Sequence, residues 1–132
     1  MTDGEFLDAL ETCALPPAEF GHAGHVRAGY LYLRNLDFAA ALASVRTTIR
    51  RYADSLGQSG RYHETKTLAY LALINQHLDE RGDGGGWDRF AAANPELLQP
   101  DLIARFYARA QLDTDQARRI FVLPRPLSNA SC

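Results

Sequence analysis

Residues 37–57 read DFAAALASVRTTIRRYADSLG, and this stretch decides the fold class. Asp37 is a residue type that caps the start of a helix, and Gly57 is typical of a helix end. Between them, the large apolar side chains fall within one narrow arc of a helical wheel, and the arginines lie off that arc. The pattern predicts an amphipathic α-helix. Its apolar face consists of Phe38, Leu42, Val45, Ile49, Tyr52 and Leu56.

Helical signals continue on both sides of this stretch. A first helix is predicted from Thr2, which has capping-box spacing with Glu5. Further helices are predicted over residues 22–35 and 62–80, where apolar side chains again recur at helical spacing. No alternating pattern is long enough for a sheet. The sequence therefore predicts an all-α fold, a compact helical bundle of four to seven helices.

The last third of the chain predicts shorter elements. A glycine-rich loop at residues 82–86 separates them from the preceding helix, and we expect it to be flexible. Asp113 and Gln116 repeat the capping-box spacing and predict another helix start. Two prolines predict an extended C-terminal tail over residues 122–132. A chain of 132 residues fits one domain, so we expect residues 1–132 to form a single helical domain.

Composition narrows the classes of function. The formal net charge is −2, whereas nucleic-acid binders normally carry a basic excess, so we expect no nucleic-acid partner. No apolar run reaches the roughly 20 residues of a membrane span, and we expect no membrane partner. Cys13 and Cys132 are too few for a disulfide framework, which together with the absence of a signal peptide predicts a cytoplasmic location. The abundance of alanine and arginine is typical of a GC-rich bacterial genome. A small domain of this kind allows a homodimer without specifying one.

Three of the four histidines are predicted to face one interior point. His22 and His25 are spaced i, i+3, which puts both rings on the core face of the helix over residues 22–35. His63 lies on the core face at the start of the helix over residues 62–80. If these two helices pack side by side with their starts at the same end, the three imidazoles meet. Three neutral imidazoles in a partly dry pocket suit a divalent transition metal, so His22, His25 and His63 are predicted metal ligands.

The residues around the histidines predict a small enzyme acting on a small molecule. A bound metal would activate water or polarise a substrate oxygen. Carboxylate and phenol groups beside it suit proton transfer, and arginine near a pocket mouth suits an anionic substrate group. The predicted catalytic residues are Glu64 and Tyr62; the predicted substrate-binding residues are Arg27, Arg61, Tyr30 and Thr67.

Two other interpretations stay open. In the first, the enzyme contains no metal, and a histidine with a tuned pKa acts as acid or base beside Tyr62 or Glu64. In the second, the protein binds a small molecule or a partner without catalysis, and the histidines form a structural polar network. The standard motifs of metalloproteases, di-iron bundles, hydrolases and nucleotide-binding proteins are absent from the sequence.

Two segments carry a resemblance. Residues 20–27 read FGHAGHVR and residues 62–65 read YHET. Together they resemble a group of small, largely uncharacterised bacterial helical proteins with F-x-H-x-x-H-V-R and Y-H-E-T motifs, over most of the chain. The resemblance implies that the two histidine segments belong together, and it carries no activity, substrate or metal.

Overall fold

The computed structural model describes residues 1–126, and all regular structure in this part of the chain is helical. The predicted all-α fold is confirmed, with seven α-helices over the described residues. The α-helices are α1 (Asp3–Glu11), α2 (His22–Asn35), α3 (Phe38–Ser55), α4 (Glu64–Arg81), α5 (Trp87–Ala93), α6 (Arg109–Leu112) and α7 (Asp115–Arg119). Four short 3₁₀ turns connect them: η1 (Pro17–Glu19), η2 (Ser59–Arg61), η3 (Pro95–Leu98) and η4 (Leu102–Arg105).

Side-chain caps start four of these helices. The capping box of Thr2 and Glu5 opens α1, and the Asp37 carboxylate accepts the backbone N–H of Ala40 at the start of α3, both as predicted. The sequence placed the last capping box at Asp113, but the side chain that caps α7 is that of Thr114. The start of α4 is capped by a histidine, His63.

Helix α2 packs against both α3 and α4 and contributes more buried apolar side chains than any other helix in the described residues. Its buried aromatic side chain, Tyr30, stacks on Phe90 of α5 with ring centroids 4.5 Å apart. Gly29 lies where α2 approaches α4 most closely, because a Cβ atom there would stand 2.9 Å from Cδ1 of Ile74 and 3.1 Å from Cδ1 of Leu71. The glycine thus sets how near α2 comes to α4.

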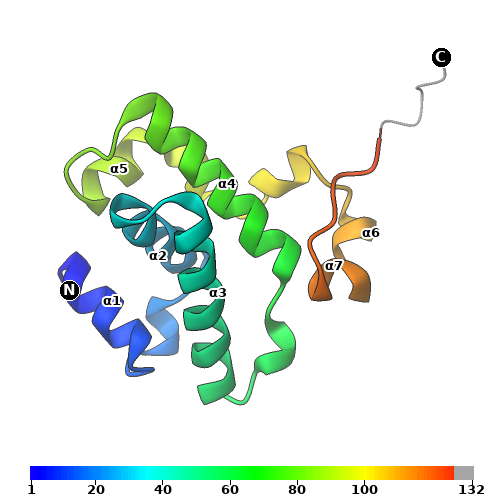
Figure 1. The fold of residues 1–132 in the computed structure, drawn as a ribbon, viewed down its shortest axis with the longest axis horizontal. Helices are drawn as coiled ribbons and strands as arrows, with labels where there is room; N and C mark the ends of the chain where they lie inside the picture. The colour runs from blue at the N-terminus through cyan, green and yellow to red at the C-terminus, as the bar shows by residue number, and fades with distance from the viewer. Residues whose placement is uncertain (127–132) are drawn as a thin grey trace.

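Helix α4 separates the larger part of the molecule from the C-terminal helices (Figure 1). Thr65, which is fully buried, donates its hydroxyl to the carbonyl of Ile120 and accepts the backbone N–H of Val122. A small apolar cluster of Ile103, Tyr107 and Leu112 packs on the same side of α4. The C-terminal segment is therefore attached to the first turns of α4.

The predicted glycine-rich loop connects α4 to α5. Gly82, Gly84 and Gly85 have φ values of 78°, 71° and 83°, a left-handed conformation that favours glycine. The loop is held by the phenol of Tyr30, which donates to the carbonyl of Asp83 over 2.6 Å. Its flexibility stays a prediction.

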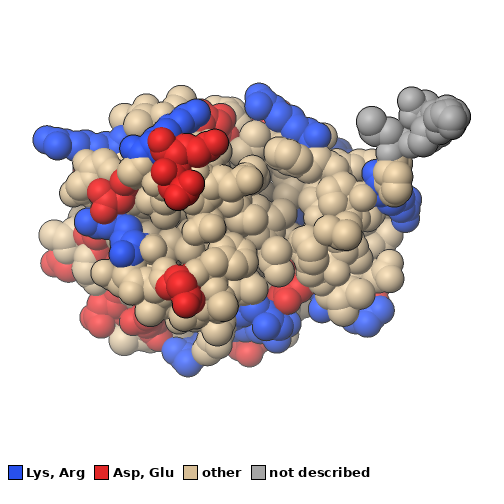
Figure 2. Space-filling view, turned by 45° about the horizontal axis from the view of Figure 1, so that its top comes forward, with Lys and Arg blue, Asp and Glu red and all other residues tan. Residues whose placement is uncertain are grey.

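Only the first part of the predicted C-terminal tail lies within the described residues. Residues 122–126 have no regular secondary structure, as predicted. The rest of the predicted tail, residues 127–132, lies outside the described residues and includes Cys132. No helix within residues 1–126 has the length and apolar character needed to cross a membrane. On the face shown in Figure 2, acidic and basic side chains are interspersed near the edge, and the centre is largely uncharged.

Candidate functional site

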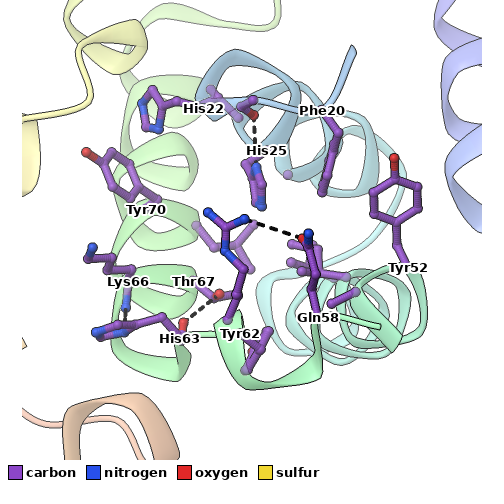
Figure 3. A pocket seen from close by; sticks show the side chains of 18 of the residues that line it. Phe20, His22, His25, Tyr52, Gln58, Tyr62, His63, Lys66, Thr67 and Tyr70 are labelled. Atoms are coloured by element: carbon purple, nitrogen blue, oxygen red, sulfur yellow. Dashed lines mark hydrogen bonds between the residues drawn. The ribbon is translucent and has the colours of Figure 1, made fainter. Parts of the chain in front are cut away.

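A cavity of about 820 Å³ lies where α2, α3 and α4 meet, and η2 and α7 complete its wall (Figure 3). Its deep part is apolar, and its rim carries polar and charged side chains. All three histidines predicted to share a site line it. The polar and aromatic lining residues are Phe20, His22, His25, Tyr52, Gln58, Arg61, Tyr62, His63, Lys66, Thr67, Tyr70 and Arg118.

His25 presents one free ring nitrogen to this cavity. Its Nδ1 lies 2.9 Å from the carbonyl oxygen of Gly21, one turn earlier in the chain. A carbonyl oxygen only accepts hydrogen bonds, so Nδ1 carries the proton and Nε2 keeps its lone pair. The ring stacks on Phe20, with centroids 4.0 Å apart and planes 23° from parallel. Desolvation by the surrounding cavity walls lowers the pKa of His25 below 6.5, and the neighbouring His22 lowers it further, against the effect of the Gly21 carbonyl, although the residue remains exposed.

His22 is held by a distant part of the chain. Its Nε2 donates to the carbonyl oxygen of Leu97 over 2.9 Å, so its Nδ1 is unprotonated in the neutral ring. The ring stands edge-on to Tyr70 of α4, with centroids 4.8 Å apart. This contact fixes where α2 begins relative to α4.

His63 has both ring nitrogens engaged in hydrogen bonds. Nδ1 accepts the backbone N–H of Lys66 over 3.1 Å, which caps α4, and Nε2 donates to the carbonyl oxygen of Leu112 over 2.7 Å. The side chain is buried, and burial lowers its pKa below 6.5. His63 thus joins the start of α4 to the end of α6 as a neutral ring.

The three imidazoles line one cavity but do not meet at one point. The predicted arrangement brings the starts of α2 and α4 together, but α2 begins beside Tyr70, partway along α4. From there it runs in the same direction as α4, because Arg34 near its end pairs with Asp83 just after α4. Tyr70 lies seven residues after His63, which is about 10 Å along the axis of α4. Within residues 1–126, no group of three His, Cys, Asp or Glu side chains is placed to hold a metal ion. A metal held by all three histidines would also require His63 to give up one of its hydrogen bonds, and the metal cofactor stays a prediction.

Of the two predicted catalytic residues, Tyr62 lines the cavity and Glu64 does not. The Tyr62 phenol donates to Oε1 of Glu64 over 2.7 Å, and the same oxygen accepts Nε of Arg46 on α3 over 3.1 Å. Burial and this bond to Glu64 raise the pKa of Tyr62 to about 12. Glu64 therefore connects α3 with α4 and orients Tyr62, and its proton-transfer role stays a prediction.

The predicted substrate-binding residues divide between two parts of the molecule. Arg61 and Thr67 line the cavity, and the Thr67 hydroxyl donates to the carbonyl of His63 (Figure 3). Arg27 instead forms an ion pair with Asp3 at 2.7 Å, outside the cavity. Tyr30 is buried against α5 and also does not line the cavity. Both lie on the side of α2 that faces away from His25.

Several lining residues were not among the predicted site residues. Lys66 and Tyr70 follow His63 by three and seven residues, so helical spacing alone could have placed them on the same face of α4. Gln58 and Arg118 come from η2's cap and from α7, and no pattern in the sequence connects them to the histidines.

Comparisons with known proteins give no relative from which a function could be carried over. No family model matches the chain, and no match is found among curated proteins or among solved structures. The function must therefore be inferred from the cavity itself.

Proposed function

We propose that this protein is a small enzyme without a metal cofactor, which acts on a small molecule held in the cavity and uses His25 as its general base. The observation that carries the proposal is the hydrogen bond from Nδ1 of His25 to the Gly21 carbonyl, which leaves the Nε2 lone pair facing the cavity. A base needs an unprotonated atom within reach of the substrate, and Nε2 meets that requirement. The cytoplasmic location and bacterial source predicted from composition are kept as part of this proposal.

The surroundings of His25 support its role as a base at neutral pH. Its lowered pKa keeps the ring neutral and able to accept a proton. The stack on Phe20 and the hydrogen bond to the Gly21 carbonyl hold the ring in one orientation, so the side chain loses little conformational entropy when a substrate binds.

His22 also keeps one ring nitrogen without a hydrogen bond, and the remaining candidate groups are less suited to proton transfer. His63 has no unengaged nitrogen. The raised pKa of Tyr62 keeps its phenol protonated near neutral pH, so it can donate a hydrogen bond but does not serve as a base. These two residues are better suited to shape the cavity wall and to orient a bound substrate.

An activated ester tests the proposed base without knowledge of the natural substrate. In hydrolysis of p-nitrophenyl acetate, water attacks the acetyl carbon while Nε2 takes its proton, and the bond to p-nitrophenolate breaks. We expect His25→Gln to lower the rate about tenfold or more, since general bases typically contribute at least that much. The wild-type rate should rise with pH with a midpoint below 6.5.

His77→Gln is the matched control, because His77 lies outside the cavity and hydrogen bonds to Leu73 and Glu96. This variant should hydrolyse the ester as fast as the wild-type protein. Acylation by diethyl pyrocarbonate, read by peptide mass spectrometry, should modify His25 and spare His63. Equal rates for His25→Gln and wild type, or modification of His63 but not of His25, would refute the proposal.

A further inference from the structure

The rim of the cavity carries positive charge, and no carboxylate lines the cavity. Arg61, Lys66 and Arg118 line it, and none of the lining residues is Asp or Glu. Within residues 1–126, none of these three side chains forms an ion pair. The chain as a whole has a formal net charge of −2, so this accumulation of one sign is local.

The three cations come from separate elements that converge on the cavity. Lys66 and Arg118, on α4 and α7, line the cavity together with His63, and the carboxylate of Asp113 also acts on that ring from outside the lining. Arg61, in η2, donates to the neutral amide oxygen of Gln58 over 3.4 Å, a contact that leaves its charge in place (Figure 3). All three side chains are exposed, which allows them to reach a ligand at the rim. Like charges brought together repel one another, and an anion bound between them would relieve that repulsion.

The deep part of the cavity has the opposite character. It is formed by the buried side chains Val26, Val45, Ile49, Leu71 and Ile74. Aromatic rings stand along its sides. A volume of about 820 Å³ falls in the range of small-molecule sites, which combine apolar walls with a few polar groups that fix orientation.

We infer that the cavity takes an organic anion: a carboxylate or phosphate monoester on an apolar body about the size of an aromatic ring. The anionic group binds the guanidinium and ammonium groups at the rim through charge-assisted hydrogen bonds. The apolar body lies against the buried aliphatic side chains, close to Nε2 of His25. This inference names the substrate class for the enzyme proposed above and concerns the same cavity.

Benzoate and phenyl phosphate are suitable probes, with benzyl alcohol and benzylammonium as uncharged and cationic counterparts and inorganic phosphate as an anion without the apolar body. Calorimetric titration at low ionic strength should show binding of benzoate or phenyl phosphate, and the tighter of the two identifies the anionic group. The other three probes should bind at least about tenfold more weakly, as expected when a charged or apolar contact is lost.

Arg61→Ala and Arg118→Ala should each weaken binding of the preferred anion about tenfold or more. Arg105→Ala is the matched control, because Arg105 is an exposed arginine that does not line the cavity, and it should bind as the wild type does. Equal binding of benzyl alcohol and benzoate would refute the anionic class, and equal binding of inorganic and phenyl phosphate would refute the apolar body. Either failure leaves the ester assay unaffected. If His25→Gln instead hydrolyses the ester as fast as wild type while anion binding is intact, only the proposed base is refuted.

Discussion

Replacing His63 by alanine removes two hydrogen bonds that connect separate parts of the fold. The first caps α4 through the backbone N–H of Lys66, and the second joins Nε2 to the carbonyl of Leu112 at the end of α6. Because both bonds serve the folded structure, we expect His63→Ala to lose stability, whereas a residue that only served catalysis could be removed without such a loss.

The size of the loss follows from these two bonds. Losing a side-chain cap costs about 1 kcal/mol. Leaving the buried Leu112 carbonyl without a donor costs about 1–3 kcal/mol. The free energy of unfolding should therefore fall by about 2–4 kcal/mol, a large part of the roughly 5–15 kcal/mol typical of a domain. At an m value of about 2 kcal/mol per M, the urea midpoint falls by roughly 1.5 M.

Urea unfolding at pH 7.5, followed by far-UV circular dichroism, measures this loss. His63→Asn separates the two contributions, because asparagine also caps helices but does not replace the bond to Leu112. Its midpoint should lie between those of His63→Ala and the wild-type protein. A His63→Ala variant within about 0.5 kcal/mol of wild type would contradict the structural role, since surface changes without a role stay in that range.

Three further predictions follow from the same geometry. Desolvation lowers the pKa of His25 and of His63 in the native state, so below about pH 6.5 the unfolded chain binds more protons than the native one. The free energy of unfolding should therefore fall as the pH drops from 7 to 5, and it should fall less in His63→Asn. Urea midpoints measured at each pH test this. Gly24→Ala should lose about 1–2 kcal/mol in the same assay because its Cβ would stand 2.8 Å from the backbone carbonyl oxygen of Glu19, which a side-chain rotation cannot relieve, whereas Gly60→Ala, with no atom near its Cβ, should change little; equal midpoints would contradict the close packing. Purified, tag-free protein should hold substoichiometric metal, and added zinc should leave its melting temperature unchanged. One metal ion per chain together with a raised melting temperature would support the metal site predicted from the three histidines and contradict the metal-free proposal.

Local signals in the sequence were enough to predict most of the fold. Helix caps and apolar periodicity are properties of neighbouring residues, and for this reason α1 and α3 start where Thr2 and Asp37 indicated. The sequence predicts the start of α4 too early, at about Tyr62, because histidine is not a usual cap and helical spacing puts His63 on the core face inside the helix. Its role as a cap depends on the bond to Leu112, 49 residues later, which no local pattern indicates.

The candidate site was predicted in part. Helical spacing correctly placed His22, His25 and His63 around one cavity. It could not predict how far apart the rings lie, since that depends on where α2 crosses α4. The crossing is set by Gly29 and by the contact of His22 with Tyr70, both of which exist only after tertiary packing.

The number of ring nitrogens engaged in hydrogen bonds distinguishes His63 from His25. Both ring nitrogens of His63 form hydrogen bonds within the fold, so neither is free to accept a proton from a substrate. In His25 only Nδ1 is engaged, and Nε2 is left to the cavity. A base works best when its pKa lies near the working pH, yet desolvation holds the pKa of His25 below 6.5. An anionic group bound at the rim of the same cavity would favour the protonated form of the ring and raise that pKa. The proposed substrate would therefore strengthen the base that acts on it, so a pKa of His25 that stays unchanged when benzoate or phenyl phosphate binds, measured by NMR, would separate the anion site from the base.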